Sequence, residues 1–303
     1  MPIDSVVLAV DLGKSRCRAV LFDSERHLVF DGAGAPGLAA RDGVAAALAA
    51  VLPALDGVRT FSSALTAVSV GAAGAWAAPA AAAEFARQLA TAAGVRSDVA
   101  SDVVSAHAGA LGGEPGVLLI AGTGAAALGI EAESARLIDG WGPELGDFGS
   151  GSWLGREALR AVLRAATGQG ERTSLEHLLR PAVGEATDIQ SWMSREGPLA
   201  RRLASLAPVV LDAAEAGDAV ASRIVREAVG LLTGSAESAT SLSVGVALHG
   251  GLTDHPWFRS ELERALVAAG RDPLLPRGDA LDGARLLAER SDLPHERFVH
   301  RAD

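Results

Sequence analysis

Apolar and polar residues follow one another in blocks at the start of the chain, and these blocks predict three short strands. Val6–Val10 is a continuous apolar run of strand length, and the turn-like segment Asp11–Ser15 follows it. A second apolar stretch, Ala19–Phe22, leads through the turn signal Asp23-Ser24 to a third strand, His27–Phe30. Short apolar runs joined by tight turns are typical of strands that pair with their sequence neighbours. We therefore expect an antiparallel meander here.

The same order of elements returns in the second half of the chain. After the meander, the pattern predicts alternating helices and strands at residues 43–55, 66–70, 80–93, 98–100 and 103–111. A strand at 117–121, a glycine turn and strands at 126–130 and 136–138 then repeat the beginning, followed by helices between 152 and 240, a strand at 244–248 and helices at 257–269 and 279–290. The repeat is one of architecture and predicts two similar α/β domains that meet near Gly112–Gly116. The alternative is coincidence, because apolar runs before glycine turns occur in any α/β protein.

Composition narrows the functional class. The 303 residues are 49% hydrophobic and 21% charged, which suits a packed core, and the formal net charge is −10. Without a basic cluster, this balance argues against nucleic acid or an anionic membrane as the partner. Cys17 is the only cysteine, which excludes an intrachain disulfide, and no apolar stretch reaches membrane-spanning length. The first five residues lack a basic leader segment, so we expect a cytoplasmic protein.

Two glycine turns occupy matching places in the two halves. In the first, Asp11 ends a buried strand, and the segment Gly13-Lys14-Ser15 can turn backbone N–H groups and a hydroxyl toward a phosphate. Asp11 could also hold a hydrated Mg²⁺. In the second half, Gly122-Thr123-Gly124 follows the equivalent strand. Neither segment is a Walker A loop or a Rossmann fingerprint, and each could be a plain hairpin turn. As a pair, they predict a grip on a polyphosphate from two sides.

Asp102 is the candidate catalytic residue. It follows a predicted strand and begins a helix, where its ordinary role would be that of a helix N-cap. Its functional role would be that of a base that accepts the proton of an attacking hydroxyl, since phosphoryl transfer needs mainly positioning and charge neutralisation. His107, further along the same helix, is expected to be a partly buried helix residue and not a ligand.

The most unusual segment runs from Gly140 to Ser152. Five glycines, Trp141 and the carboxylates of Glu144 and Asp147 precede a helix that begins near Trp153. An aromatic face beside carboxylates is what a sugar site uses, whereas the alternative is a structural loop with its tryptophan in the core. Further along, Gly250-Gly251 follows a strand and could let adenine or ribose lie against the backbone, or could simply cap a helix.

Taken together and in order, these segments resemble the sugar kinase/actin/Hsp70 superfamily. Within it, the chain is most similar to the branch of N-acetylglucosamine kinases and BadF/BadG/BcrA/BcrD-type ATPases. The matching pieces are AVDLGKSRCRAVLFD (9–23), SDVVSAHAGALGGEPGVLLIAGTGAAALG (101–129), DGWGPELGDFGSGSWLGREAL (139–159), VALHGGL (246–252) and PRGDALDGARLLAE (276–289).

The resemblance implies an α/β protein of two ribonuclease-H-like (actin-like ATPase) domains, each a mixed sheet flanked by helices, with ATP in the cleft between them. The last helix would pack back on the first domain, which gives domains of 1–113 plus 276–303 and of 114–275, and homodimers would be common. By the resemblance, each segment also has a role. The phosphate loops are Asp11, Gly13, Lys14 and Ser15, with Asp11 at Mg²⁺, and Gly122, Thr123 and Gly124; the catalytic residue is Asp102; the sugar contacts are Trp141, Gly146 and Asp147; and the adenosine motif is Gly250 and Gly251.

The chain also departs from the family pattern, mainly in the sugar pocket. A family-typical Asn would fall near Leu38, but the chain contains no Asn, and the usual Gly-Asp-Glu-Gly reads Gly-Asp-Phe-Gly with Phe148 in place of a carboxylate. In the phosphate segments, the first loop has fewer glycines than usual, and Ala125 replaces a common Ser. The sugar could therefore be N-acetylglucosamine, glucosamine or N-acetylmuramic acid.

Three other functions compete with the kinase. An ATPase that activates a partner enzyme through an iron–sulfur cluster would need more thiolates than Cys17 supplies. A non-catalytic sugar or nucleotide sensor is favoured by the changes at Leu38 and Phe148, but both Asp11 and Asp102 are retained. A repressor would need an added helix-turn-helix, for which we expect no room before Val6.

Overall fold

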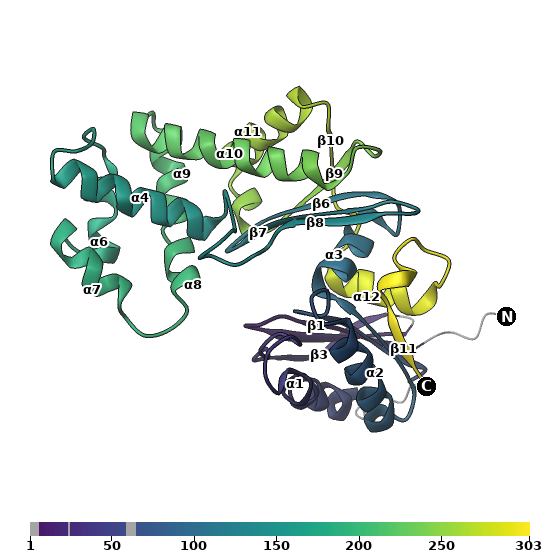
Figure 1. Cartoon of the computed structure of the whole chain (residues 1–303). Helices are drawn as coiled ribbons and strands as arrows, with labels where there is room; N and C mark the ends of the chain where they lie inside the picture. Colours follow the sequence, from purple (N-terminus) through teal and green to yellow (C-terminus); the bar gives the residue numbers. More distant parts are fainter. Residues whose placement is uncertain (1–5, 24, 59–64) are drawn as a thin grey trace. The chain divides into compact units, whose positions relative to one another are not determined.

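The structure, a computed structural model, describes residues 6–23, 25–58 and 65–303. Ser24 of the predicted turn and the first five residues, where we expect no leader, lie outside the described residues. The chain divides into two compact units, unit 1 (residues 1–115 and 276–303) and unit 2 (residues 116–275). Figure 1 follows the chain through both. Within the described ranges, no helix has both the length and the apolar character needed to cross a bilayer.

Unit 1 is built on a six-stranded mixed sheet. Its strands are β1 (Val7–Leu12), β2 (Cys17–Phe22), β3 (Arg26–Gly32), β4 (Ala67–Ala72), β5 (Arg96–Ser101) and β11 (His300–Ala302), in the order β11-β5-β4-β1-β2-β3. β1, β2 and β3 pair antiparallel, which confirms the predicted meander, and β1, β4 and β5 run parallel. Because parallel strands end at one edge of a sheet, the residues that follow β1, β4 and β5 share that edge.

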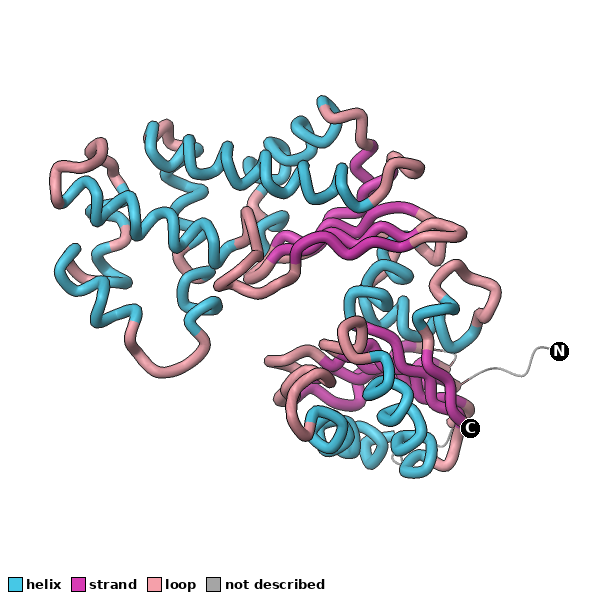
Figure 2. The backbone as a smooth tube through the Cα atoms, in the orientation of Figure 1, coloured by secondary structure: helices cyan, strands magenta, loops and turns pink. Residues whose placement is uncertain are grey.

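Helices cover both faces of this sheet (Figure 2). They are α1 (Gly43–Val58), α2 (Pro79–Ala93), α3 (Asp102–Leu111) and α12 (Ala280–Glu289). The larger core forms under α1 and α2, while α12 packs on β1 and β4 and against α3. The α3–α12 crossing is close, because a Cβ on Gly109 would overlap the carbonyl oxygen of Asp279 and a Cβ on Gly283 that of Ser105. The helix that begins at Asp102 is therefore held backbone to backbone by the last helix.

A buried ion pair joins the C-terminal strand β11 to the neighbouring strand β5. Asp98 in β5 is fully buried, and its carboxylate meets Arg301 of β11 at 2.9 Å and Arg96 at 3.2 Å. Burial raises the pKa of Asp98, while the two guanidinium groups act in the opposite direction. A buried carboxylate needs such partners, and removing one arginine would leave Asp98 with a single guanidinium group to offset its charge.

A pair of buried histidines corrects the expectation for His107, which is fully buried instead of partly buried. Its Nδ1 lies 2.8 Å from Nε2 of His295, which is also fully buried and belongs to the segment between α12 and β11. Burial, with the neighbouring charges of His107 and Arg297, lowers the pKa of His295 to about 3. Sequence reasoning missed this pairing because the partner lies 188 positions away.

This pair should make unit 1 sensitive to mild acid. The unfolded chain protonates His295 near pH 6.5, whereas the folded chain keeps it neutral down to about pH 3, so unfolding takes up a proton across that window. We expect the free energy of unfolding to fall by up to about 1.4 kcal/mol per pH unit as pH drops below 6.5. Urea unfolding at pH 7.5, 6 and 5 tests this. The slope should be shallower in His295→Gln, and equal slopes in the two proteins would contradict the prediction.

Unit 2 repeats the topology of unit 1. Its strands are β6 (Gly116–Ala121), β7 (Ala125–Ile130), β8 (Ala135–Asp139), β9 (Gly245–His249) and β10 (Asp272–Leu274), in the order β10-β9-β6-β7-β8. Again the first three strands pair antiparallel, and the first, fourth and fifth run parallel. The predicted internal repeat and the predicted α/β class are therefore confirmed. β10 and β11 were not predicted.

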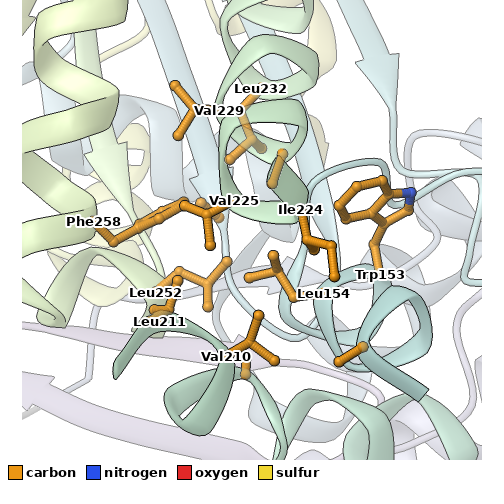
Figure 3. Close-up of a cluster of buried hydrophobic side chains, with 14 of the residues drawn as sticks. Trp153, Leu154, Val210, Leu211, Ile224, Val225, Val229, Leu232, Leu252 and Phe258 are labelled. Carbon is orange, nitrogen blue, oxygen red and sulfur yellow. The ribbon is translucent and has the colours of Figure 1, made fainter. Parts of the chain in front are cut away.

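The helices of unit 2 form one large core with its sheet. They are α4 (Gly151–Ala166), α5 (Leu175–Leu178), α6 (Arg180–Val183), α7 (Ile189–Met193), α8 (Leu199–Ala204), α9 (Ala207–Glu215), α10 (Ala219–Ala239) and α11 (Pro256–Ala268), with short 3₁₀ turns η1 (Ala186–Asp188) and η2 (Gly251–Asp254). Figure 3 shows side chains of α4, α9, α10 and α11 meeting around Ile224 and Val225. This core fixes α4, whose first turn donates hydrogen bonds to the second glycine turn, Gly122-Thr123-Gly124.

Candidate active site

The first glycine turn joins β1 to β2. The N–H of Gly13 donates to the carbonyl of Arg16 at 2.9 Å, and the N–H of Ala35 donates to the carbonyl of Gly13 at 3.2 Å. Lys14 and Ser15 are exposed at the tip, and no described residue accepts a hydrogen bond from their N–H groups. A turn that is closed beneath and has unused N–H groups at its tip is suited to an anion.

Asp11 lies inside β1 and not in the turn, which disfavours the plain hairpin-turn interpretation. Its Oδ2 accepts a hydrogen bond from Nη2 of Arg18 at 2.8 Å, and the side chains are 23% and 33% exposed. Arg18 is the cross-strand partner of Asp11 in the β1–β2 pair. Sequence reasoning did not single out Arg18, although the turn between Leu12 and Cys17 fixes that register and could have revealed it.

Asp102 is the first residue of α3, and Ser101 occupies the N-cap position. The ordinary N-cap role therefore does not describe Asp102. Its Oδ1 accepts hydrogen bonds from the Ser101 hydroxyl and the Val103 N–H, both at 3.0 Å. Burial raises the pKa of Asp102, the two hydrogen bonds lower it, and the charge of Asp11 raises it further. A carboxylate with a raised pKa is a better proton acceptor than a carboxylate with the ordinary pKa of an exposed aspartate.

The structure brings Asp102 and Asp11 to the same edge of the unit 1 sheet. Gly71 of β4 is the register partner of Asp11, and a Cβ on Gly71 would lie 3.4 Å from the Cα of Asp102. The charges of Asp11 and Lys14 both act on the pKa of Asp102. The unit 1 candidates, namely Asp11, the turn 13–15 and Asp102, thus form one cluster.

The second glycine turn joins β6 to β7 in unit 2. The N–H of Gly122 donates to the carbonyl of Gly124 at 2.9 Å, which closes the turn as Gly13 does in unit 1. Thr123 is exposed, and among the residues described none accepts a hydrogen bond from the N–H of Thr123 or Gly124. Both turns therefore have N–H groups that the described residues leave unused, and such groups would let each turn bind a phosphate.

Gly250 lies against this second turn. It has φ 109°, and a Cβ there would come within 2.6 Å of the carbonyl oxygen of Ala121 and 2.9 Å of the N of Gly122. Gly251 begins η2, and a Cβ there would make only an ordinary contact, 3.9 Å from the carboxylate of Asp254. Gly250 is therefore needed for close packing against the second glycine turn, whereas Gly251 is accessible.

The loop from Asp139 to Gly149 does not bury its tryptophan. Trp141 is 64% exposed, which argues against the structural-loop alternative. The carboxylate of Asp147 faces the second turn, where its Oδ1 accepts the Ala125 N–H at 3.2 Å. Gly146 packs beneath the loop, against the carboxylate of Asp139 and the backbone of Trp141. The predicted sugar contacts thus lie in one segment beside the second turn.

The two departures noted in the sequence have different structural settings. Leu38, where a family-typical Asn would fall, is 3% exposed and packs in the core of unit 1. Phe148 is partly exposed in the loop beside Asp147. Only the second change therefore places a different side chain on the surface of the candidate sugar loop.

Comparison with known proteins identifies relatives along most of the chain. The family model of the BadF/BadG/BcrA/BcrD ATPase family matches residues 8–286. Over 134 residues, the chain is 34% identical to an N-acetyl-D-glucosamine kinase of Dictyostelium discoideum and 36% identical to an N-acetylmuramic acid/N-acetylglucosamine kinase of Clostridium acetobutylicum. These matches cover 43% of this chain and only 42% and 44% of the two relatives.

Solved structures share the fold over nearly the whole chain. A provisionally assigned N-acetylglucosamine kinase from Chromobacterium violaceum is 27% identical, with a TM-score of 0.73 over 95% of this chain and 100% of that one. A similarly assigned protein from Porphyromonas gingivalis is 21% identical, with a TM-score of 0.70 over 94% of this chain and 99% of that one. The two mixed sheets flanked by helices are thus the fold of this group of structures.

Proposed function

We propose that this chain, which belongs to the BadF/BadG/BcrA/BcrD ATPase family, transfers the γ-phosphoryl group of ATP to a hydroxyl group of an amino sugar. Membership of an ATPase family implies the use of ATP. The relatives named as kinases of N-acetylglucosamine and N-acetylmuramic acid support the choice of acceptor. N-acetyl-D-glucosamine is our first candidate, and glucosamine and N-acetylmuramic acid are the alternatives.

The observation that carries the proposal is the setting of Asp102. Its Oδ1 is held by Ser101 and Val103, so the carboxylate has a fixed orientation at the sheet edge that also bears Asp11 and the first turn. In phosphoryl transfer, a carboxylate so placed orients the attacking hydroxyl and takes its proton as the new O–P bond forms. We assign Asp102 this role.

Both glycine turns are assigned to the phosphates. The N–H groups of Lys14 and Ser15 in one unit, and of Thr123 and Gly124 in the other, point to anion binding because the described residues leave them unused. Gly250 and Gly251 are assigned to the adenosine part of ATP.

Mg²⁺ fits the donor set at Asp11. A carboxylate is the oxygen ligand that Mg²⁺ prefers, and the ion usually keeps most of its waters, which leaves room for Arg18 on the other oxygen. When bound, Mg²⁺ would neutralise charge on the phosphates. Arg18 holds Asp11 in place and adds a second positive charge at the same edge.

We assign the sugar to the loop that contains Trp141, Gly146 and Asp147. The exposed indole offers an apolar face for sugar C–H groups, and the Asp147 carboxylate an acceptor for a hydroxyl. Phe148, where the family usually has a carboxylate, would make this surface more apolar. We therefore expect a preference for a sugar with an apolar substituent, such as the acetyl group, over glucosamine.

A coupled ADP-release assay over a panel of free sugars tests this function. We expect turnover with N-acetylglucosamine above the background hydrolysis of ATP, and a lower kcat/KM with glucosamine. Glucose serves as the control that lacks the amino group. ATP binding without turnover of any sugar would reject the kinase and favour the sensor.

We further propose that the protein works in the cytoplasm as a homodimer and does not bind nucleic acid. The net charge of −10 supports the last point. Cys17 is the only cysteine of the chain, so the sequence carries no disulfide framework of the kind that secreted proteins use, which supports the cytoplasm.

A further inference from the structure

We propose that Asp139 is a positioning residue that fixes the candidate sugar loop on the second glycine turn, so that ATP and sugar affinity both depend on it. Asp139 is the last residue of β8 and is 3% exposed. It is neither a predicted site residue nor exposed enough to contact a ligand directly. The inference rests on the proposed function, which assigns the second glycine turn to the phosphates of ATP and the loop to the sugar.

The backbone of Asp139 marks it as a special position. Its backbone φ is 62°, a conformation that residues other than glycine rarely adopt and that costs about 1 kcal/mol or more. Its carboxylate gives the reason for retaining it. Oδ1 accepts the N–H of Asp147 and Oδ2 the N–H of Phe148, each at 2.7 Å. One buried carboxylate therefore folds the loop back on itself across eight residues.

The glycine at position 146 follows from this arrangement. A Cβ on Gly146 would overlap Oδ1 of Asp139 and lie 3.1 Å from the Cβ of Trp141. Gly146, which is predicted to contact the sugar, thus also leaves the space that the Asp139 carboxylate occupies beneath the loop. This places Trp141 and Asp147 on a support that Asp139 forms.

The loop so fixed is bonded to the second turn. Asp147 accepts the Ala125 N–H at 3.2 Å, while the Gly140 N–H donates to the Ala125 carbonyl at 3.0 Å. The Asp147 carboxylate also occupies the space above Gly124, where a Cβ would lie 2.8–3.0 Å from it. Asp139 therefore affects the second glycine turn by holding Asp147 against it.

The far end of the same segment holds the other side of the turn. The N–H groups of Gly151 and Ser152, at the start of α4, donate to the carbonyls of Gly122 and Thr123 at 2.8 and 3.1 Å. The carbonyls of Gly122 and Thr123 are thus engaged by α4, while the N–H groups of Thr123 and Gly124 are left for an anion. If residues 146–148 moved, the second glycine turn would lose its contacts on one side but keep its bonds to α4. The turn would therefore persist with an altered shape.

The test compares Asp139→Asn with Glu131→Gln. Asparagine keeps the size of Asp139 and tolerates positive φ, but its amide group cannot accept both N–H bonds. Glu131 is the matched control, because it is also a buried unit 2 carboxylate that anchors a loop, through Thr240 and Ser243, and lies at the opposite end of β7 from the turn. Asp139→Gly removes both bonds at a position where glycine is unstrained, and it replaces the asparagine variant should that variant fold poorly.

The first readout is calorimetric binding of ATP with Mg²⁺ in the absence of sugar. We expect the ATP Kd to rise about ten-fold in Asp139→Asn and further in Asp139→Gly, with Glu131→Gln close to the wild type. The second readout is the KM for the sugar that the panel identifies, which should rise in the Asp139 variants alone. Wild-type ATP affinity in both Asp139 variants, or equal losses in Glu131→Gln, would overturn the inference. Because ATP binding needs no sugar, the inference remains testable even if the panel yields no substrate.

Discussion

Replacing Asp102 with asparagine is expected to lower kcat by about a hundred-fold or more while the affinity for ATP changes by less than about two-fold. Asparagine can still accept hydrogen bonds from Ser101 and Val103 through its carbonyl oxygen, so the start of α3 should keep its shape. It cannot take a proton from the attacking hydroxyl. The loss should therefore appear in kcat, measured by ADP release, and not in calorimetric ATP binding.

Asp98→Asn is the control for Asp102→Asn. Asp98 is a buried aspartate of β5 whose pKa is also raised by burial, but its partners are Arg96 and Arg301 and not the site. This change should lower thermal stability and leave kcat nearly unchanged. Normal turnover in Asp102→Asn, or loss of ATP binding, would show that Asp102 is a structural residue of α3.

The pH profile gives an independent check on Asp102. The base must be ionised, so activity falls as pH drops through its pKa. Because burial raises that pKa, the acid limb of kcat/KM should lie at higher pH than an ordinary aspartate, near 3.9, would give. The residual activity of Asp102→Asn should lack this limb.

The sequence was sufficient for the elements and for the candidate turns, because both depend on short-range patterns. Apolar runs and glycines predicted the strands on either side of each turn within one or two residues of their observed ends. β10 and β11 were missed because each has only three residues and one contains Pro273. Strands that short carry no periodic signal and form because a neighbouring strand offers its edge.

The contacts that support the site could not be predicted, because each joins residues far apart in the chain or depends on an unusual backbone angle. Arg18 is the exception, since the register of the first hairpin places it opposite Asp11. Asp139, before a glycine at the end of a strand, is an ordinary turn residue in sequence, and its role depends on φ 62° and on a fold-back eight residues later. His295 depends on where the chain returns after α12.

The return of α12 onto α3 leads to the largest expected effect on stability. We expect Gly283→Ala to destabilise the protein by about 3 kcal/mol, because its Cβ would overlap the Ser105 carbonyl and lie 2.5 Å from the N of Gly109. These neighbours are backbone atoms of α3 and cannot rotate away, so the two helices must separate. Since α3 begins at Asp102, kcat of the folded fraction should also fall, by about ten-fold or more.

Gly230→Ala is the matched control for this change. Gly230 also lies inside a helix, α10, but a Cβ there would meet nothing within 4 Å. Alanine should stabilise that helix by about 0.5–1 kcal/mol and leave kcat unchanged. Urea unfolding followed by circular dichroism measures both variants, and ADP release measures their turnover. Equal stability of the two variants would mean that α3 and α12 do not approach backbone to backbone, and the support proposed for Asp102 from the last helix would then be lost.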